Sequence, residues 1–63
     1  MKQKEIKNMA QKFAKLEQII QTNESPEAVA RAQAEQMKLS KNIHNLEDML
    51  AIDELVIEIL HKN

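Results

Sequence analysis

The stretch TNESPE, residues 22–27, decides the predicted fold, because it interrupts an otherwise helix-forming chain. Ser25 is predicted to be a helix N-cap, since its hydroxyl can accept a free backbone N–H of the first turn. Pro26 would then be the first helical residue, where its missing N–H costs nothing. Asn23 can take the left-handed conformation that often ends a helix. Residues 23–25 are therefore predicted to form a tight turn between two helices.

The composition favours helices on both sides of this turn. The 63 residues include no Gly, one Pro, one Phe and neither Trp nor Tyr. Gly and Pro are the residues that interrupt helices, whereas sheets depend on β-branched and aromatic residues. A chain this short buries little of its surface, and without Cys it has no disulfide or thiolate-bound metal to compensate. We expect a single all-α domain, residues 1–63, that is stabilised by partner chains.

Apolar residues recur in steps of three and four along both halves, which is the spacing of a packed helix seam. The first helix is predicted over about residues 2–22 and the second over about residues 26–61. Together they would form an antiparallel hairpin with a short first helix and a long second helix. Its expected core consists of Ile6, Met9, Phe13, Leu16, Ile20, Val29, Ala32, Leu39 and Ile43.

The two predicted helices differ in length. At about 1.5 Å per residue they span roughly 30 Å and roughly 54 Å, so the first covers the second only up to about Leu46. The uncovered end is the most apolar part of the chain, and such a patch marks an interaction site. Two-fold pairing would bury it and give a homo-oligomeric helical bundle, a dimer or a tetramer. The predicted oligomer interface is Leu46, Met49, Leu50, Ile52, Asp53, Val56, Ile57, Ile59 and Leu60.

Asp53 offers an alternative to an unbroken second helix. Asp is a good N-cap, so a break there would start a short third helix that folds back and gives a three-helix monomer. In an unbroken helix, a buried Asp53 is costly without a partner and would fix the register of the bundle. The other reading places it in water at the edge of the interface, since a straight helix drifts about 20° per heptad.

Charge is separated along the chain, although the net charge is only −1. Residues 1–22 carry five Lys against two Glu, and residues 46–63 carry one Lys against five carboxylates. Phosphate neutralisation by lysines is the main source of non-specific nucleic-acid affinity. A single Arg and no aromatic residue free for stacking argue against that use. The candidate nucleic-acid contacts are Lys4, Lys7, Lys12 and Lys15.

Residues with catalytic or metal-binding chemistry are sparse. Glu58 and His61 have the Glu-x-x-His spacing of di-iron bundles, but such sites need a second motif and further inward-facing Glu residues. Ser40 and His44 share a helix face, but the third group and the oxyanion site of a triad are missing. We therefore expect no enzyme activity, no catalytic residue, no cofactor and no metal site.

The function predicted from these features is a small non-enzymatic protein–protein interaction or regulatory module that acts as a homo-oligomer and binds a protein partner. A nucleic-acid-binding dimeric bundle that uses the lysine face of the first helix is the alternative. Residues 1–8 do not resemble a signal peptide, and no apolar run approaches the length that spans a membrane. The expected location is cytoplasmic, with no membrane association.

Overall fold

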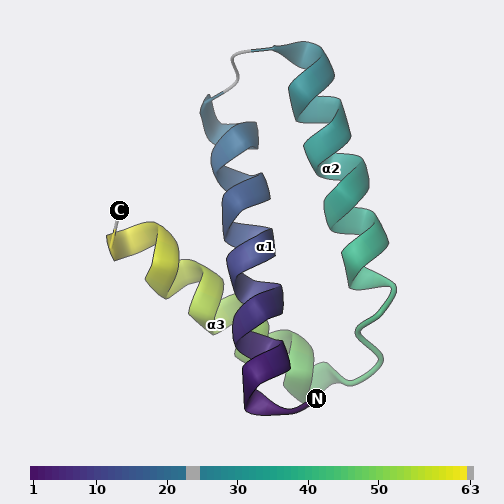
Figure 1. Cartoon of the computed structure of the whole chain (residues 1–63), viewed down its shortest axis with the longest axis vertical. Helices are drawn as coiled ribbons and strands as arrows, with labels where there is room; N and C mark the ends of the chain where they lie inside the picture. Colours follow the sequence, from purple (N-terminus) through teal and green to yellow (C-terminus); the bar gives the residue numbers. More distant parts are fainter. Residues whose placement is uncertain (23–24, 63) are drawn as a thin grey trace.

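The computed structural model of the chain describes residues 1–22 and 25–62. It contains three α-helices: α1 (Gln3–Thr22), α2 (Pro26–Ser40) and α3 (Leu46–Lys62). Helices α1 and α2 run side by side in opposite directions, and α3 crosses behind α1 (Figure 1). The prediction of an all-α chain is confirmed. The prediction of a two-helix hairpin is wrong, because the long second helix is two helices.

The first predicted boundary lies where the sequence placed it, although one detail differs. Pro26 begins α2, and Ser25 holds the N-cap position in an extended conformation with φ −149° and ψ 129°. The Ser25 carbonyl accepts the Val29 N–H at 3.0 Å. Its hydroxyl caps no backbone N–H in the described part of the chain, so the predicted side-chain cap is missing. The prediction for Asn23 lies outside the described residues.

The helix expected to continue to residue 61 stops at Ser40. The Ser40 hydroxyl donates to the Met37 carbonyl at 2.7 Å, a local bond that competes with regular helix geometry. The Asn42 N–H then donates to the Leu39 carbonyl at 3.0 Å, and the Ile43 N–H donates to the Ser40 carbonyl at 3.1 Å. These bonds span three residues instead of four, which is the way helices tighten at their ends.

A new helix then begins after Asn45. The Asn45 side-chain oxygen accepts the Glu47 N–H at 2.8 Å, and its carbonyl accepts the Met49 N–H at 3.1 Å. Asn is among the strongest N-cap residues because it satisfies these free N–H groups. The break therefore lies at residues 41–45. The alternative break at Asp53 is also wrong, because Asp53 lies inside α3.

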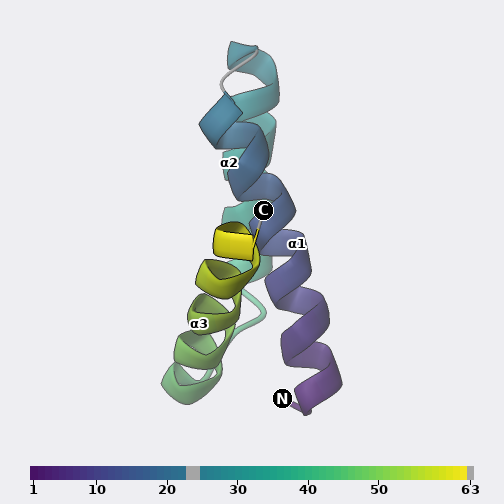
Figure 2. The same ribbon diagram turned by 90° about the vertical axis from the view of Figure 1, so that its left-hand side faces the viewer.

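Helix α1 lies between the other two (Figures 1 and 2). It contacts both α2 and α3, whereas no Cα atom of α2 lies within 8 Å of α3 in the described residues. In residues 1–22 and 25–62 the buried residues are Ala10, Ala14, Ala32 and Ile52. Three of the four are alanines, which allow close helix approach but bury little apolar area. The return of α3 onto α1 buries Ile52, which a straight continuation of α2 would leave in water.

Candidate interaction surfaces

Helix α3 has two apolar sides, and only one of them packs on α1. Ile52 is 2% exposed on the packed side, whereas Leu46, Leu50 and Ile57 are 71%, 55% and 56% exposed. The exposed residues follow helical spacing and share one side of α3 with Asp53, which is also exposed. We call this row, Leu46, Leu50, Asp53 and Ile57, the α3 stripe.

Acidic residues border the α3 stripe. Helix α3 carries five carboxylates against one lysine, Lys62, a net charge of −4 with His61 neutral. Glu47, Glu54 and Glu58 are exposed along one edge of the stripe. Asp48 is different, because its Oδ2 atom lies 3.1 Å from the α-amino nitrogen of Met1. The stripe is thus an apolar row with an acidic border.

A second surface lies between α1 and α2. It is a groove of about 580 Å³ with an apolar floor formed by Leu16, Ile19, Ala28 and Ala32. An adjoining hollow of about 360 Å³ shares Leu16 and Ile19 and extends the floor to Leu39. We call both together the α1–α2 groove.

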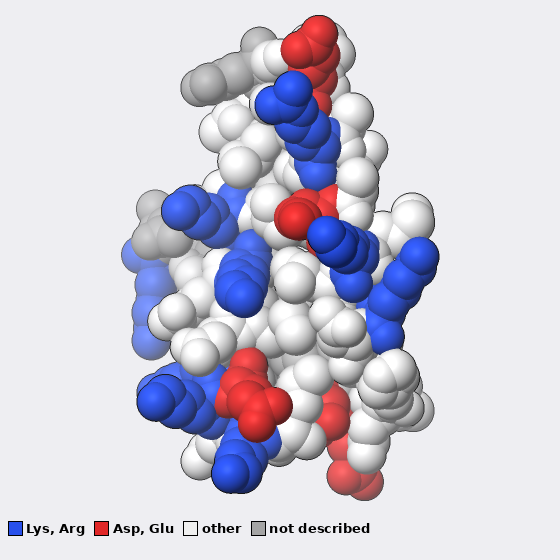
Figure 3. Space-filling model, turned by 45° about the vertical axis from the view of Figure 1, so that its right-hand side comes forward, with Lys and Arg blue, Asp and Glu red and all other residues white. Residues whose placement is uncertain are grey.

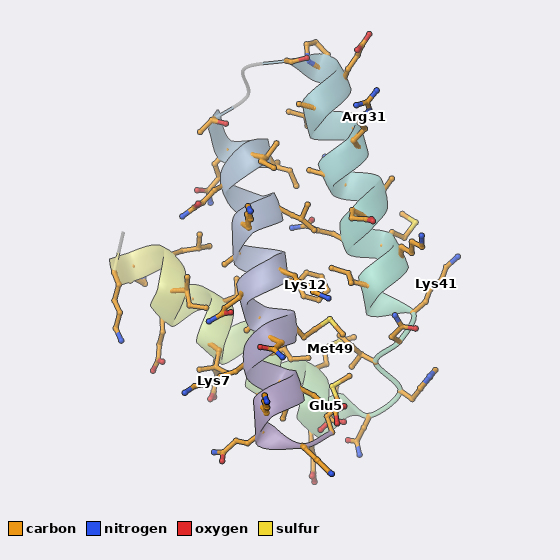
Figure 4. The ribbon with its side chains drawn as sticks, viewed as in Figure 1. Glu5, Lys7, Lys12, Arg31, Lys41 and Met49 are labelled. Atoms are coloured by element: carbon orange, nitrogen blue, oxygen red, sulfur yellow. The ribbon has the colours of Figure 1, made fainter. Side chains whose placement is uncertain are left out.

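Positive charge surrounds the α1–α2 groove. Lys12 and Lys15 line it from α1, and Arg31 and Lys38 line it from α2, against one carboxylate among the described lining residues, Glu35. All four cationic side chains are exposed. Basic side chains outnumber acidic ones on this face of the molecule and surround an uncharged area (Figure 3). Lys12 and Arg31 belong to different helices on the two sides of the groove (Figure 4).

A third hollow, of about 320 Å³, is lined by all three helices. Beside it the Gln36 amide donates to Glu17 Oε2 at 3.0 Å and to the Phe13 carbonyl at 3.5 Å. These bonds link α2 to α1 and provide acceptors for the side-chain amide of Gln36. Asp53 and Val56 line the same hollow from α3.

The structure divides the predicted oligomer interface into two groups. Ile52 is buried, and Val56, Ile59 and Leu60 are half-buried. The exposed members are Leu46, Met49, Leu50, Asp53 and Ile57. Whether this surface joins copies of the chain stays a prediction.

The other predicted residues occupy distinct places. In the expected core Ala32 is buried, and the remaining members (Ile6, Met9, Phe13, Leu16, Ile20, Val29, Leu39 and Ile43) are half-buried. Lys4, Lys7, Lys12 and Lys15 are all exposed. Only Lys12 and Lys15 line the α1–α2 groove, whereas Lys7 lines a separate hollow with Glu58 of α3.

Sequence reasoning missed two groups of residues. The expected core left out Ala10 and Ala14, which are both buried. Ala10 widens the apolar stripe of the first helix in the sequence, and Ala14 follows it at a spacing of four residues. Arg31 and Lys38 were not linked to the lysines of α1, since only the packing of α2 on α1 brings the two pairs to one groove.

Catalytic and metal-binding geometry is limited in the described residues. They contain no group of three or more His, Cys, Asp or Glu side chains arranged to hold a metal ion. His44 and His61 are both exposed. Within the same ranges, no helix has the length and apolar content needed to cross a membrane.

No known protein family, curated protein or solved structure matches the chain.

Proposed function

We propose that this protein is a small non-enzymatic protein–protein interaction module that self-associates through the α3 stripe. The observation that carries the proposal is the row of three large apolar side chains, Leu46, Leu50 and Ile57, each more than half exposed. Ile52, on the other apolar side of α3, is the residue that is buried where α3 packs on α1. An exposed apolar row with a polar border is typical of an interface.

The physical case rests on how little the single chain buries. Complete burial of a Leu or Ile side chain stabilises by about 1.5–3 kcal/mol, so covering three such side chains offers several kcal/mol before the costs of association. Within the described part of the chain, one large apolar side chain is fully buried, Ile52. Association that covers the stripe would stabilise the folded state by mass action.

Introducing a positive charge at apolar positions of the α3 stripe tests the proposal. We expect Leu50→Lys and Ile57→Lys each to reduce the molar mass in solution toward the 7.3 kDa of one chain, because a lysine cannot be buried unpaired. Size-exclusion chromatography with light scattering measures the mass, and circular dichroism checks that the helices persist.

Met37→Lys is the matched control, since Met37 is 66% exposed on α2 and lies off the stripe. It should keep the wild-type mass. A wild-type protein that is monomeric at several hundred micromolar, or stripe variants that keep the wild-type mass, would show that the proposal is wrong.

Nucleic-acid binding is the second candidate, because Arg31 and Lys38 share a groove with Lys12 and Lys15. Four phosphate contacts would make affinity fall steeply with salt, since binding releases condensed counterions. The candidate ranks second because the floor between these cations is apolar and offers no aromatic ring for stacking. The test is the affinity for a labelled duplex of about 20 base pairs and for a labelled single strand, measured by fluorescence anisotropy between about 50 and about 200 mM salt.

A further inference from the structure

We propose that the α1–α2 groove is the docking site for the α3 stripe of a second copy of this chain. The inference rests on the proposed function, because it assumes that the stripe is an interaction surface, and it adds the identity of the receiving surface. The stripe and the groove share no residue, so one molecule can present both at once.

The apolar parts of the two surfaces suit each other. Helices that dock in grooves anchor through side chains spaced i, i+4, i+7 and i+11, and Leu46, Leu50, Asp53 and Ile57 have this spacing. The receiving floor is elongated, because the 580 Å³ groove and the 360 Å³ hollow adjoin along α1. Ile19 on this floor is itself 36% exposed.

The charges are opposite in sign. Four cations border the groove, two from each helix, against Glu35 alone. The stripe contains Asp53 and is bordered by Glu47, Glu54 and Glu58, all exposed. Apolar contact between these surfaces would bring carboxylates beside lysines and an arginine, and such complementarity selects the partner and its orientation. The acidic amphipathic helix that this groove suits is thus present in the chain itself.

Pairing of one stripe with another is disfavoured by Asp53. This residue lies within the stripe, three positions after Leu50 and four before Ile57. Two parallel stripes would place Asp53 of one copy beside Asp53 of the other, and two antiparallel stripes would place it beside Leu50. A carboxylate that faces a like charge or an apolar side chain opposes association, whereas the groove offers cations to the same carboxylate.

Because the two surfaces differ, the contact is heterologous. Two such contacts close a dimer if a two-fold axis relates them, and otherwise they generate a ring or an open chain. In each case every contact needs one intact groove and one intact stripe. This requirement provides a complementation test.

The test uses two double variants of the full chain. Lys15→Glu with Arg31→Glu reverses the charge of the groove and leaves the stripe intact. Leu50→Lys with Ile57→Lys removes the stripe and leaves the groove intact. We expect each variant alone to be monomeric, and an equimolar mixture to form a one-to-one heterodimer with twice the 7.3 kDa mass. Light scattering gives the mass, and circular dichroism confirms that both variants remain helical.

Lys4→Glu with Lys41→Glu is the matched control, since it changes the net charge equally at exposed lysines that do not line the groove. It should keep the wild-type mass. If the groove variant also keeps the wild-type mass while the stripe variant loses it, the proposed function stands and the groove is not the receiving surface.

Two other outcomes would overturn the inference. A mixture that stays monomeric shows that the groove and the stripe do not bind each other. A wild-type protein that carries strong absorbance near 260 nm, lost in the groove variant, assigns the groove to nucleic acid. The chain has no Trp or Tyr, so such absorbance cannot come from the protein.

Discussion

Ile52 carries a large share of the packing at the residue scale. Among the residues that the structure describes, it is the one large side chain in the buried set, and the other members are alanines. Most of the apolar seam of α1, including Phe13 and Leu16, is only half-buried. The fold therefore depends on one well-packed side chain and on many partial contacts, and a substitution at Ile52 has no second large residue to compensate for it.

We expect Ile52→Ala to lower the free energy of unfolding by about 2–5 kcal/mol, through lost burial and the cavity left behind. Small domains are stable by as little as about 5 kcal/mol, so this loss is a large fraction of the total and should move the unfolding midpoint to a clearly lower urea concentration. Urea titration followed by circular dichroism measures the change. Met37→Ala, at an exposed position, should change stability by less than about 0.5 kcal/mol. Equal effects of the two substitutions would contradict the assigned core.

At the scale of the elements, the junction at residues 41–45 makes this a three-helix protein. It contains two Asn and a β-branched Ile, which are weak helix formers, and it ends at the Asn45 cap. Glu47 and Asp48 follow in the first turn of α3, where negative charge favours a helix start. These local features divide one long amphipathic pattern into α2 and α3.

Removal of the Asn45 cap tests the junction. Asn45→Ala should destabilise the protein by about 1 kcal/mol, because the Glu47 N–H loses its acceptor. Asn42→Ala, at a position whose side chain caps no helix, is the comparison and should have a smaller effect. Amide hydrogen exchange in the first turn of α3 should become faster in Asn45→Ala and should stay unchanged in Asn42→Ala. Unchanged protection there would mean that the cap does not hold the start of α3.

On the scale of the whole molecule, charge and apolar surface are divided between two sides. The α1–α2 groove is basic and the α3 stripe is acidic, and each has an apolar centre. Folding separates these surfaces, because α3 crosses behind α1 (Figures 1 and 2). The groove is lined by residues of α1 and α2. A single chain thus presents two different and complementary surfaces.

Self-association through these surfaces makes thermal stability depend on concentration. Where the partner reaches a hundred times the dissociation constant, binding adds about 2.7 kcal/mol, and a domain of this size gains about 4–8 °C in Tm per kcal/mol. We expect the Tm of the wild type to rise by several °C over about a hundredfold increase in protein concentration. The Tm of Ile57→Lys should stay constant. A wild-type Tm that is independent of concentration would contradict self-association.

Sequence alone determined the helical content, the extent of the first helix and the start of α2 at Pro26, because propensity and capping are local properties. It also determined the opposite charges of the two ends. The cap at Asn45, followed by Glu47 and Asp48, could have been read from the sequence, but the prediction did not use it. Tertiary structure decided whether the apolar pattern after Ser40 continued straight or turned back. That choice depends on the free energy gained by burying Ile52 against α1 compared with the cost of interrupting a helix, and only packing between residues distant in the sequence sets this balance.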